Sequence, residues 1–417
     1  MTACRRPDTV GVPPSIGIIL AGIFKLPDET SVTGRFAPKW AAMLVSAATL
    51  MGLPAACYGQ DYDSGGPFST RAIAGVLKKA DDWQLAHPVM PDGDRNWRRA
   101  TWYTGVMAAY QATGDPAYLD QAMRWAEPQQ WKPGTEEAGA NVLTCSQTYL
   151  ELYFLKGNRA MIEPTVKWLD SGRPNTPTGS KSWYVVDNLP YADSLYVGAP
   201  ALAMLAKATG NHKYLDWMNA FFWDVHHELF DQEYGLFYRD SRFMGQKTAN
   251  GGKVFWSRGN GWVVASLPRI LAYLPRDDPN RERYESLFKR LAAAIIRRQQ
   301  PDGLWRPNLD DTYEFPTPET SGTGFFCYGL AWGIRNGLLD KNTYLPATMK
   351  AWSGLVANVG ASGKVQWGQS VGDSPDTVSQ GDSDEFVTGT FMLAGSEMFQ
   401  LAKDGSLVGA KPKAGER

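Results

Sequence analysis

Apolar residues recur at helical spacing along most of the chain. From about Ser69 onward, amphipathic segments with apolar residues three and four positions apart follow one another, and short stretches of Gly, Asn, Asp and Pro separate them. Segments that alternate apolar and polar residues over the length of a strand are scarce. The pattern therefore predicts an all-α protein.

A phrase that joins one helix to the next recurs four times. It reads ATGDPAYLDQAMRWAE from Ala112, LKGNRAMIEPTVKWLD from Leu155, ATGNHKYLDWMNAFFW from Ala208 and RNGLLDKNTYLPATMKAW from Arg335. In each phrase a glycine can take the left-handed position that ends one helix, and an Asp or Asn soon after it can cap the next. The glycines are Gly114, Gly157, Gly210 and Gly337.

Stacked helical hairpins explain this repetition. Roughly six hairpins fit the segment 69–401, and one hairpin cannot bury its own apolar face, so neighbours must pack against it. An open solenoid and a closed ring both meet that need. The connections opposite the short joints are long and rich in Trp, Gly, Pro and Arg, which favours a closed α/α barrel with a substrate mouth. These connections are 131–142, 171–191, 237–255 and 301–323. We expect one domain over 69–401 and a tail over 402–417.

An export signal is predicted ahead of this domain. Residues 35–60 read RFAPKWAAMLVSAATLMGLPAACYGQ, which is a basic start, an apolar stretch and then small residues, in the order of a secretory signal. The apolar stretch is short for a membrane span. We therefore expect residues 1–60 to be a leader and the mature protein to be periplasmic. A second apolar run lies upstream, so a start near Met43 and a two-segment leader are both open, as is a lipoprotein acylated at Cys57.

Charge and composition narrow the partners. The chain has 42 basic and 43 acidic residues, so its field would neither hold a nucleic acid nor dock on a membrane surface. Its four Cys and four His show no zinc-ligand spacing. Its 16 Trp, 18 Tyr and 17 Phe often stand beside Gly, Asn, Asp or Arg, a combination that suits sugar rings, although core packing also uses large rings. The expected partner is a small-molecule sugar.

Three segments carry a more specific signal. They are FWSRGNGWVVASL from Phe255, YADSLYVGAP from Tyr191 and PETSGTGFFCYGLAWGIRNGLL from Pro318. These resemble the WxRGNGW, CDALFMAPP and ETSGTA stretches of glycoside hydrolase family 105, the unsaturated rhamnogalacturonyl and related uronyl hydrolases. The likeness runs in the same order from about residue 82 to residue 401 and leaves out the leader.

This resemblance implies an (α/α)6 barrel without metal or organic cofactor. It also implies a substrate, the unsaturated uronic acid that a polysaccharide lyase leaves at the non-reducing end of a pectin- or rhamnogalacturonan-type oligosaccharide. The C4=C5 bond of that sugar is a vinyl ether, so it can be protonated at C4 and take up water at C5. The resulting hemiketal opens and expels the rest of the chain. One carboxyl group that gives a proton and then activates water is the minimum requirement.

The resemblance assigns the role of general acid/base to Asp193. In this sequence Asp193 stands at the head of an apolar helical run. The alternative is therefore a structural carboxylate that caps the helix by accepting backbone N–H groups.

The pocket residues of WxRGNGW carry over to Trp256, Arg258 and Trp262. A guanidinium can hold a uronate carboxylate with two hydrogen bonds, flanking indoles can sandwich the ring, and Gly259 permits close approach of the backbone to a ligand. An arginine that ties two loops together is the alternative for Arg258.

Three further residues have weaker support from the family pattern. Arg239 stands where some relatives carry a histidine beside the substrate, and it can bind but not relay a proton because arginine does not titrate near neutral pH. Trp102 and Tyr103 match an aromatic wall of the pocket, with core packing as a nearly equal alternative.

One departure from the family concerns a second carboxylate. Relatives commonly carry an NADD-type stretch whose aspartate joins the catalytic one, but this chain has Asn141 and Val142 in those places. We retain Asn141 as a substrate-binding residue. Glu136, Glu137 and Asp187 are candidate replacements for the missing carboxylate.

Two other functions fit parts of the pattern. One is an α/α-barrel glycanase that acts on saturated chains through two carboxylates. The other is a carbohydrate-binding relative that has kept the aromatic pocket without turnover. For the hydrolase itself, unsaturated galacturonate on rhamnose, unsaturated glucuronate on another sugar and a sulfated variant are all open as substrates.

Overall fold

The computed structural model describes residues 66–91, 93–135, 139–171, 185–186 and 189–407. The predicted leader, residues 1–60, lies outside these ranges, as does the predicted tail beyond residue 407. In the described part, helices dominate, and none of them is long and apolar enough to cross a membrane. The prediction of an all-α fold is confirmed.

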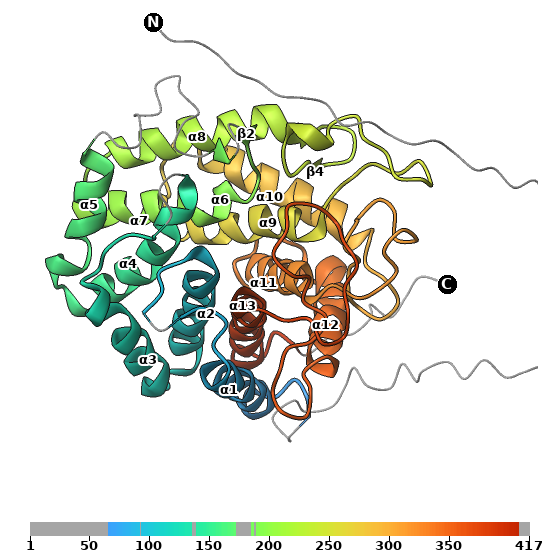
Figure 1. Cartoon of the computed structure of the whole chain (residues 1–417), viewed down its shortest axis with the longest axis horizontal. Helices are drawn as coiled ribbons and strands as arrows, with labels where there is room; N and C mark the ends of the chain where they lie inside the picture. The colour runs from blue at the N-terminus through green and yellow to red at the C-terminus, as the bar shows by residue number, and fades with distance from the viewer. Residues whose placement is uncertain (1–65, 92, 136–138, 172–184, 187–188, 408–417) are drawn as a thin grey trace, which may run out of the picture. The chain divides into compact units, whose positions relative to one another are not determined.

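The helices form two concentric sets (Figure 1). The inner set contains α2 (Trp97–Thr113), α4 (Thr144–Lys156), α6 (Ser194–Val197), α7 (Ala199–Thr209), α9 (Ser257–Leu271), α11 (Thr320–Arg335) and α13 (Glu385–Lys403). The outer set contains α1 (Thr70–Ala86), α3 (Pro116–Ala126), α5 (Glu163–Asp170), α8 (Lys213–Leu229), α10 (Arg281–Ile296) and α12 (Lys341–Ala357).

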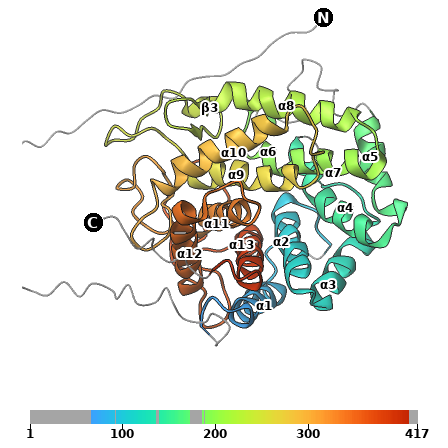
Figure 2. The same cartoon turned by 180° about the vertical axis from the view of Figure 1, so that it is seen from behind.

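Inner and outer helices alternate along the chain, with the short α6 leading into α7. The inner helices pack side by side in chain order, and α13 returns to pack against α2, which closes the ring (Figure 2). Every residue of α9 is buried, whereas α12 buries one face only. The inner helices are therefore buried both against the outer set and inside the ring, where Tyr196, Trp262 and Phe325 from three inner helices meet. The structure has the (α/α)6 barrel arrangement that the sequence predicts.

The predicted joints are present. Gly114, Gly157 and Gly210 end α2, α4 and α7 with φ angles of 75°, 70° and 69°, in the left-handed region where glycine carries no steric penalty. Asp115 and Asp340 then accept backbone N–H groups at the starts of α3 and α12.

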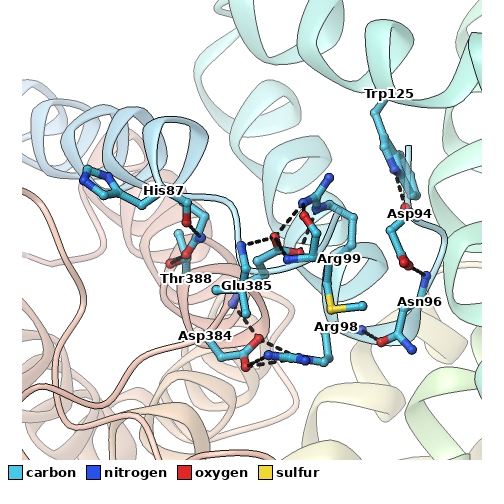
Figure 3. Close-up of polar contacts among 12 residues, drawn as sticks. His87, Asp94, Asn96, Arg98, Arg99, Trp125, Asp384, Glu385 and Thr388 are labelled. Carbon is cyan, nitrogen blue, oxygen red and sulfur yellow. Dashed lines mark hydrogen bonds and ion pairs between the residues drawn. The ribbon is translucent and has the colours of Figure 1, made fainter. Parts of the chain in front are cut away.

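Two arginine–carboxylate pairs lock the closing contact (Figure 3). Arg98 pairs with Asp384, and Arg99 donates to Glu385 over 2.6 and 2.7 Å. Glu385 also accepts the backbone N–H groups of Val89 and Met90. Because bidentate pairs of this kind fix both distance and orientation, they set the register of α13 against α2.

Short elements decorate the loops between the helices. Strands β1 (Val185–Val186) and β2 (Leu189–Pro190) pair antiparallel, as do β3 (Phe230–Asp231) and β4 (Leu236–Phe237). Single 3-10 turns occur at η3 (Glu127–Gln129), η4 (Ala140–Leu143), η5 (Arg159–Met161) and η7 (Ser241–Phe243). The strand β4 leads directly to the functional site.

Candidate active site

A pocket of about 160 Å³ opens where the inner helices begin. Trp97 is the first residue of α2, Asn141 lies in η4 just before α4, and Asp193 immediately precedes α6. The complete lining is Trp97, Asn141, Tyr191, Asp193, Val197, Arg239, Trp256, Arg258, Trp262, Val371 and Gly372. The structure thus brings together Asp193, Arg239, Asn141 and the three WxRGNGW residues, as the sequence analysis expects.

The carboxyl group of Asp193 is buried and incompletely bonded. Although Asp193 occupies the position before α6, its side chain accepts no N–H group of that helix, so the capping alternative does not fit the geometry. Its Oδ1 has no hydrogen-bond partner among the described residues. Burial raises the pKa of Asp193 from 3.8 to about 6, against the opposing pull of Arg239 and Arg258. A carboxyl group with such a pKa can both give and take a proton near neutral pH.

Arg239 is the cation beside this carboxyl group. Its Nε lies 3.6 Å from Oδ2 of Asp193, too far for a good hydrogen bond, while its Nη1 donates to Asp240 over 2.8 Å. The guanidinium lies over the ring of Tyr191, 5.1 Å from the centroid. Nε has no hydrogen-bond partner among the described residues, so Arg239 keeps a donor for a ligand.

Asn260 explains how the RGNGW motif builds this geometry. Its side chain accepts the backbone N–H of Phe237 over 2.8 Å and donates to the carbonyl of the same residue over 2.9 Å, which ties β4 to α9. Two residues later the carbonyl of Arg239 accepts the N–H of Ala192. The motif therefore holds the segments that carry Arg239 and Asp193 next to each other.

Arg258 is buried, lines the pocket and also hydrogen-bonds to the backbone of a neighbouring loop. Its Nη1 donates to the carbonyl of Gln369 over 2.7 Å, and its Nη2 donates to that of Ser370 over 2.8 Å. The guanidinium also lies between the rings of Trp256 and Phe386. Backbone carbonyls thus take one N–H group of each terminal nitrogen, so Arg258 ties the 369–370 segment to α9, as the structural alternative for this residue expects. Each terminal nitrogen carries two N–H groups, so the binding of a uronate carboxylate by Arg258 stays a prediction. Nε alone lacks a partner among the described residues.

Tryptophan rings form the apolar walls. Trp262 and Trp97 meet edge to face with centroids 5.9 Å apart, and Trp256 donates from Nε1 to the side chain of Gln369 over 2.8 Å. Gly259 lies close behind, where an added Cβ would stand 3.1 Å from the Trp256 ring and 3.7 Å from Oδ1 of Asp193. Gly259 thus allows α9 to pack against the acid rather than lining the pocket itself.

Asn141 faces the pocket as a neutral group. Its Oδ1 accepts a hydrogen bond from the hydroxyl of Tyr191 over 2.8 Å. The residue in the place of the family's second carboxylate is thus oriented by a neighbour of Asp193. The candidate replacements Glu136, Glu137 and Asp187 lie outside the described residues.

Trp102 and Tyr103 do not reach this pocket, which corrects their assignment as an aromatic wall. The pocket lies at the start of α2, and Trp102 is five residues deeper, about 7.5 Å along the helix axis. Its Nε1 donates to the buried Asp81 over 2.9 Å. Tyr103 stacks on Trp125 with centroids 4.1 Å apart. Both residues pack the barrel wall, and Trp97 supplies the aromatic surface instead.

Five residues of the lining were not predicted from the sequence: Trp97, Tyr191, Val197, Val371 and Gly372. Tyr191 and Val197 stand in the quoted YADSLYVGAP segment, so their proximity to Asp193 could have suggested them. Trp97 is one of many tryptophans, and the segment around Val371 carries no motif. The sequence around Trp97 and around Val371 therefore contains no pattern that would place these residues in a pocket.

The chemistry available in the pocket is that of one carboxyl group between two cations and aromatic walls. Asp193 is the only carboxylate among the described residues of the lining. No group of three or more His, Cys, Asp or Glu residues in the described ranges could hold a metal ion. Among the described residues, Cys145 and Cys327 form no disulfide and are buried elsewhere in the barrel. The site is suited to proton transfer on an anionic, ring-shaped ligand.

Comparison with known proteins gives a consistent result. The family model of Glycosyl Hydrolase Family 88 matches residues 70–402. Two relatives are each named "Unsaturated 3S-rhamnoglycuronyl hydrolase". The one from Formosa agariphila is 35% identical over 348 residues, 79% of this chain and 91% of that protein. The one from Alteromonas sp. is 35% identical over 349 residues, 78% of this chain and 84% of that protein.

A solved structure extends the likeness to three dimensions. A glycosyl hydrolase family 88 protein from Bacteroides vulgatus superposes with a TM-score of 0.72 at 31% identity, covering 80% of this chain and 99% of that one. The family match spans the whole barrel and includes every residue of the pocket lining. The chain therefore belongs to glycosyl hydrolase family 88 and is a glycoside hydrolase.

Proposed function

We propose that this protein removes a 4,5-unsaturated uronic acid from the non-reducing end of lyase-generated oligosaccharides, in the manner of family 105 enzymes. The observation that carries the proposal is the single buried carboxyl group of Asp193, with Oδ1 unpaired among the described residues and a pKa raised to about 6. The RGNGW and ETSG motifs support the family 105 type. The names of the two relatives favour rhamnose as the neighbouring sugar among the pectin- and rhamnogalacturonan-type chains.

The proposed reaction is hydration of the vinyl ether. Protonated Asp193 gives its proton to C4, and positive charge develops at C5 and the ring oxygen. The Asp193 carboxylate then takes a proton from water as that water adds to C5. The resulting hemiketal opens to a ketone, and the bond to the neighbouring sugar breaks in the same rearrangement. Asp193 ends protonated again, so one group completes the cycle.

The remaining residues of the lining bind the sugar. Trp97 and Trp262 offer flat apolar surfaces to the ring. Arg239 offers its Nε to the uronate carboxylate, beside the proton donor. A glycanase for saturated chains requires two carboxylates, about 5 to 9.5 Å apart. Asp193 is the one carboxylate among the described residues of the lining, which fits the single carboxyl group that hydration needs.

The test is a paired assay with an unsaturated uronyl disaccharide and the same disaccharide with its double bond reduced. We expect the ultraviolet absorbance of the conjugated double bond to fall as the neighbouring sugar is released, and no release from the reduced compound. Release from the reduced compound at a similar rate would contradict the proposal. Matched disaccharides ending in rhamnose and in other sugars then define the preferred neighbour.

A further inference from the structure

Residues 369–374 form a small loop at the edge of the pocket. The side chain of Gln369 donates from Nε2 to the carbonyl of Ser374 over 2.7 Å, which closes the loop on itself. Val371 and Gly372 at its tip belong to the pocket lining. Val371 is 52% exposed. The loop therefore forms part of the rim that a substrate passes.

The base of the loop is fixed to buried helices. The N–H of Gln369 donates to Glu319, the carboxylate that caps α11. The carbonyls of Gln369 and Ser370 accept from Arg258 at the start of α9. These contacts are buried or partly buried, and they fix residues 369 and 370 but not the tip of the loop, residues 371–373.

An ion pair holds the tip. Asp373 accepts a hydrogen bond from Nη2 of Arg242 over 2.6 Å, and the two side chains are 43% and 41% exposed. Arg242 also binds the buried Asp240 through Nε and Nη2, over 2.9 and 2.8 Å.

The same ion pair connects to the acid. Asp240 binds Arg239 over 2.8 Å, and Arg239 approaches Asp193 to 3.6 Å. Charges of alternating sign therefore run from the rim of the pocket to its proton donor: Asp373, Arg242, Asp240, Arg239 and Asp193. Arg242 and Arg239 share the carboxylate of Asp240.

We propose that Asp373 and Arg242 are positioning residues for the reaction, whose ion pair holds the 369–374 loop against the pocket and keeps Arg239 in place beside Asp193. This inference rests on the proposed function. Neither residue belongs to the lining, so each acts through others: Asp373 through Val371 and Gly372, and Arg242 through Asp240 and Arg239. The pair lies outside the proton transfer itself, so it governs substrate affinity more than turnover.

The first experiment replaces the carboxylate at the tip. With the unsaturated disaccharide as substrate, Asp373→Asn should raise KM roughly two- to fivefold, the range expected for a partly exposed ion pair. The kcat should stay within about a factor of two, because Asp193 is untouched. Asp373→Glu keeps the charge and should restore most of the affinity. Melting temperatures of all variants show that the fold is intact.

A matched control comes from the outer helices. Asp170 pairs with Lys213 over 2.7 Å, with side chains 41% and 34% exposed, and neither residue belongs to the pocket lining. Asp170→Asn removes an ion pair of similar length and exposure, so KM should not change. A KM rise of equal size in this control would show that the loss in Asp373→Asn is a general effect of charge, and would overturn the inference.

A double-mutant cycle tests the connection between the two residues. Arg242→Gln should raise KM more than Asp373→Asn, because it also removes a partner of Asp240. The double variant should match Arg242→Gln alone, since the pair is already broken. If the KM increases of the two single variants multiplied in the double variant, the residues would act independently, which would overturn the proposal. An unchanged KM in Asp373→Asn would overturn it as well. If the wild-type protein turns over no unsaturated uronide, the proposed function fails first, and this inference fails with it.

Discussion

Replacing Asp193 by Asn should reduce activity and increase stability at the same time. The pKa of Asp193 rises from 3.8 to about 6 on folding because the group is buried. The ionised carboxylate therefore opposes folding, with no cost below pH 3.8 and the full cost above about pH 6. A rise of the pKa from 3.8 to about 6 corresponds to about 3 kcal/mol. Asn has nearly the same shape and no charge, so the variant avoids this cost.

The assay combines unfolding curves at two pH values with turnover of the unsaturated disaccharide. At pH 7 the variant should be more stable by up to about 3 kcal/mol, and near pH 4 most of this gain should disappear. Turnover should fall by roughly 10²- to 10⁴-fold, the contribution of general acid/base catalysis. If the variant and the wild type were equally stable at each of the two pH values, or if the variant kept more than about a tenth of wild-type turnover, Asp193 would not be the buried general acid/base.

A true cap provides the matched control for Asp193. Asp115 accepts the N–H of Ala117 over 3.0 Å at the start of α3, away from the pocket. Asp115→Ala should lower stability by about 0.5 to 2 kcal/mol without affecting turnover. Asp193→Ala loses no such bond, so a stability loss of the same size there would revive the capping interpretation.

Three further outcomes follow from the structure and the sequence. Arg258→Lys keeps the charge but can satisfy only one of two buried carbonyls, so it should cost about 1 to 3 kcal/mol of stability and raise KM, measured by denaturation and kinetics. Trp102→Phe leaves the buried Asp81 without its indole donor, so it should destabilise the protein by about 1 to 3 kcal/mol and leave KM unchanged. A raised KM would show that Trp102 contributes to the pocket after all. We expect periplasmic protein to begin between about residues 57 and 69, as mass spectrometry of the intact chain would show, whereas full-length cytosolic protein would contradict export.

The sequence predicted the parts of the fold that depend on local chemistry. Left-handed glycines such as Gly114 and caps such as Asp340 act within a few residues, so the helix joints could be located from the chain alone. The ring closure could not be derived in this way, because the pairs of Arg98 with Asp384 and Arg99 with Glu385 join residues far apart in the chain. Only the long connections opposite the short joints and the family likeness pointed to a closed ring.

In the candidate site, too, the residues that stand in local motifs were predicted and the long-range contacts were not. Asp193, Trp256 and Trp262 stand in motifs and lie in the pocket as expected. Trp102 has the right residue type but lies too deep along α2, a difference that sequence spacing does not reveal without knowing where the helix begins. The partners of Arg258 come from the 369–370 carbonyls, and backbone groups leave no trace in a sequence pattern. Long-range backbone contacts are what the sequence could not supply.

The central claim, hydration rather than displacement at the anomeric carbon, is tested most directly by running the reaction in heavy water and analysing the released uronic acid by NMR and mass spectrometry. The account predicts that deuterium enters C4 at the rate of turnover, because Asp193 exchanges its proton with solvent and delivers it there. The product is sampled early, before C4, which now lies next to the C5 ketone, exchanges further with solvent. The account also predicts that the C4=C5 bond is lost in every turnover. A released sugar that keeps its double bond and carries no deuterium at C4 would contradict the account.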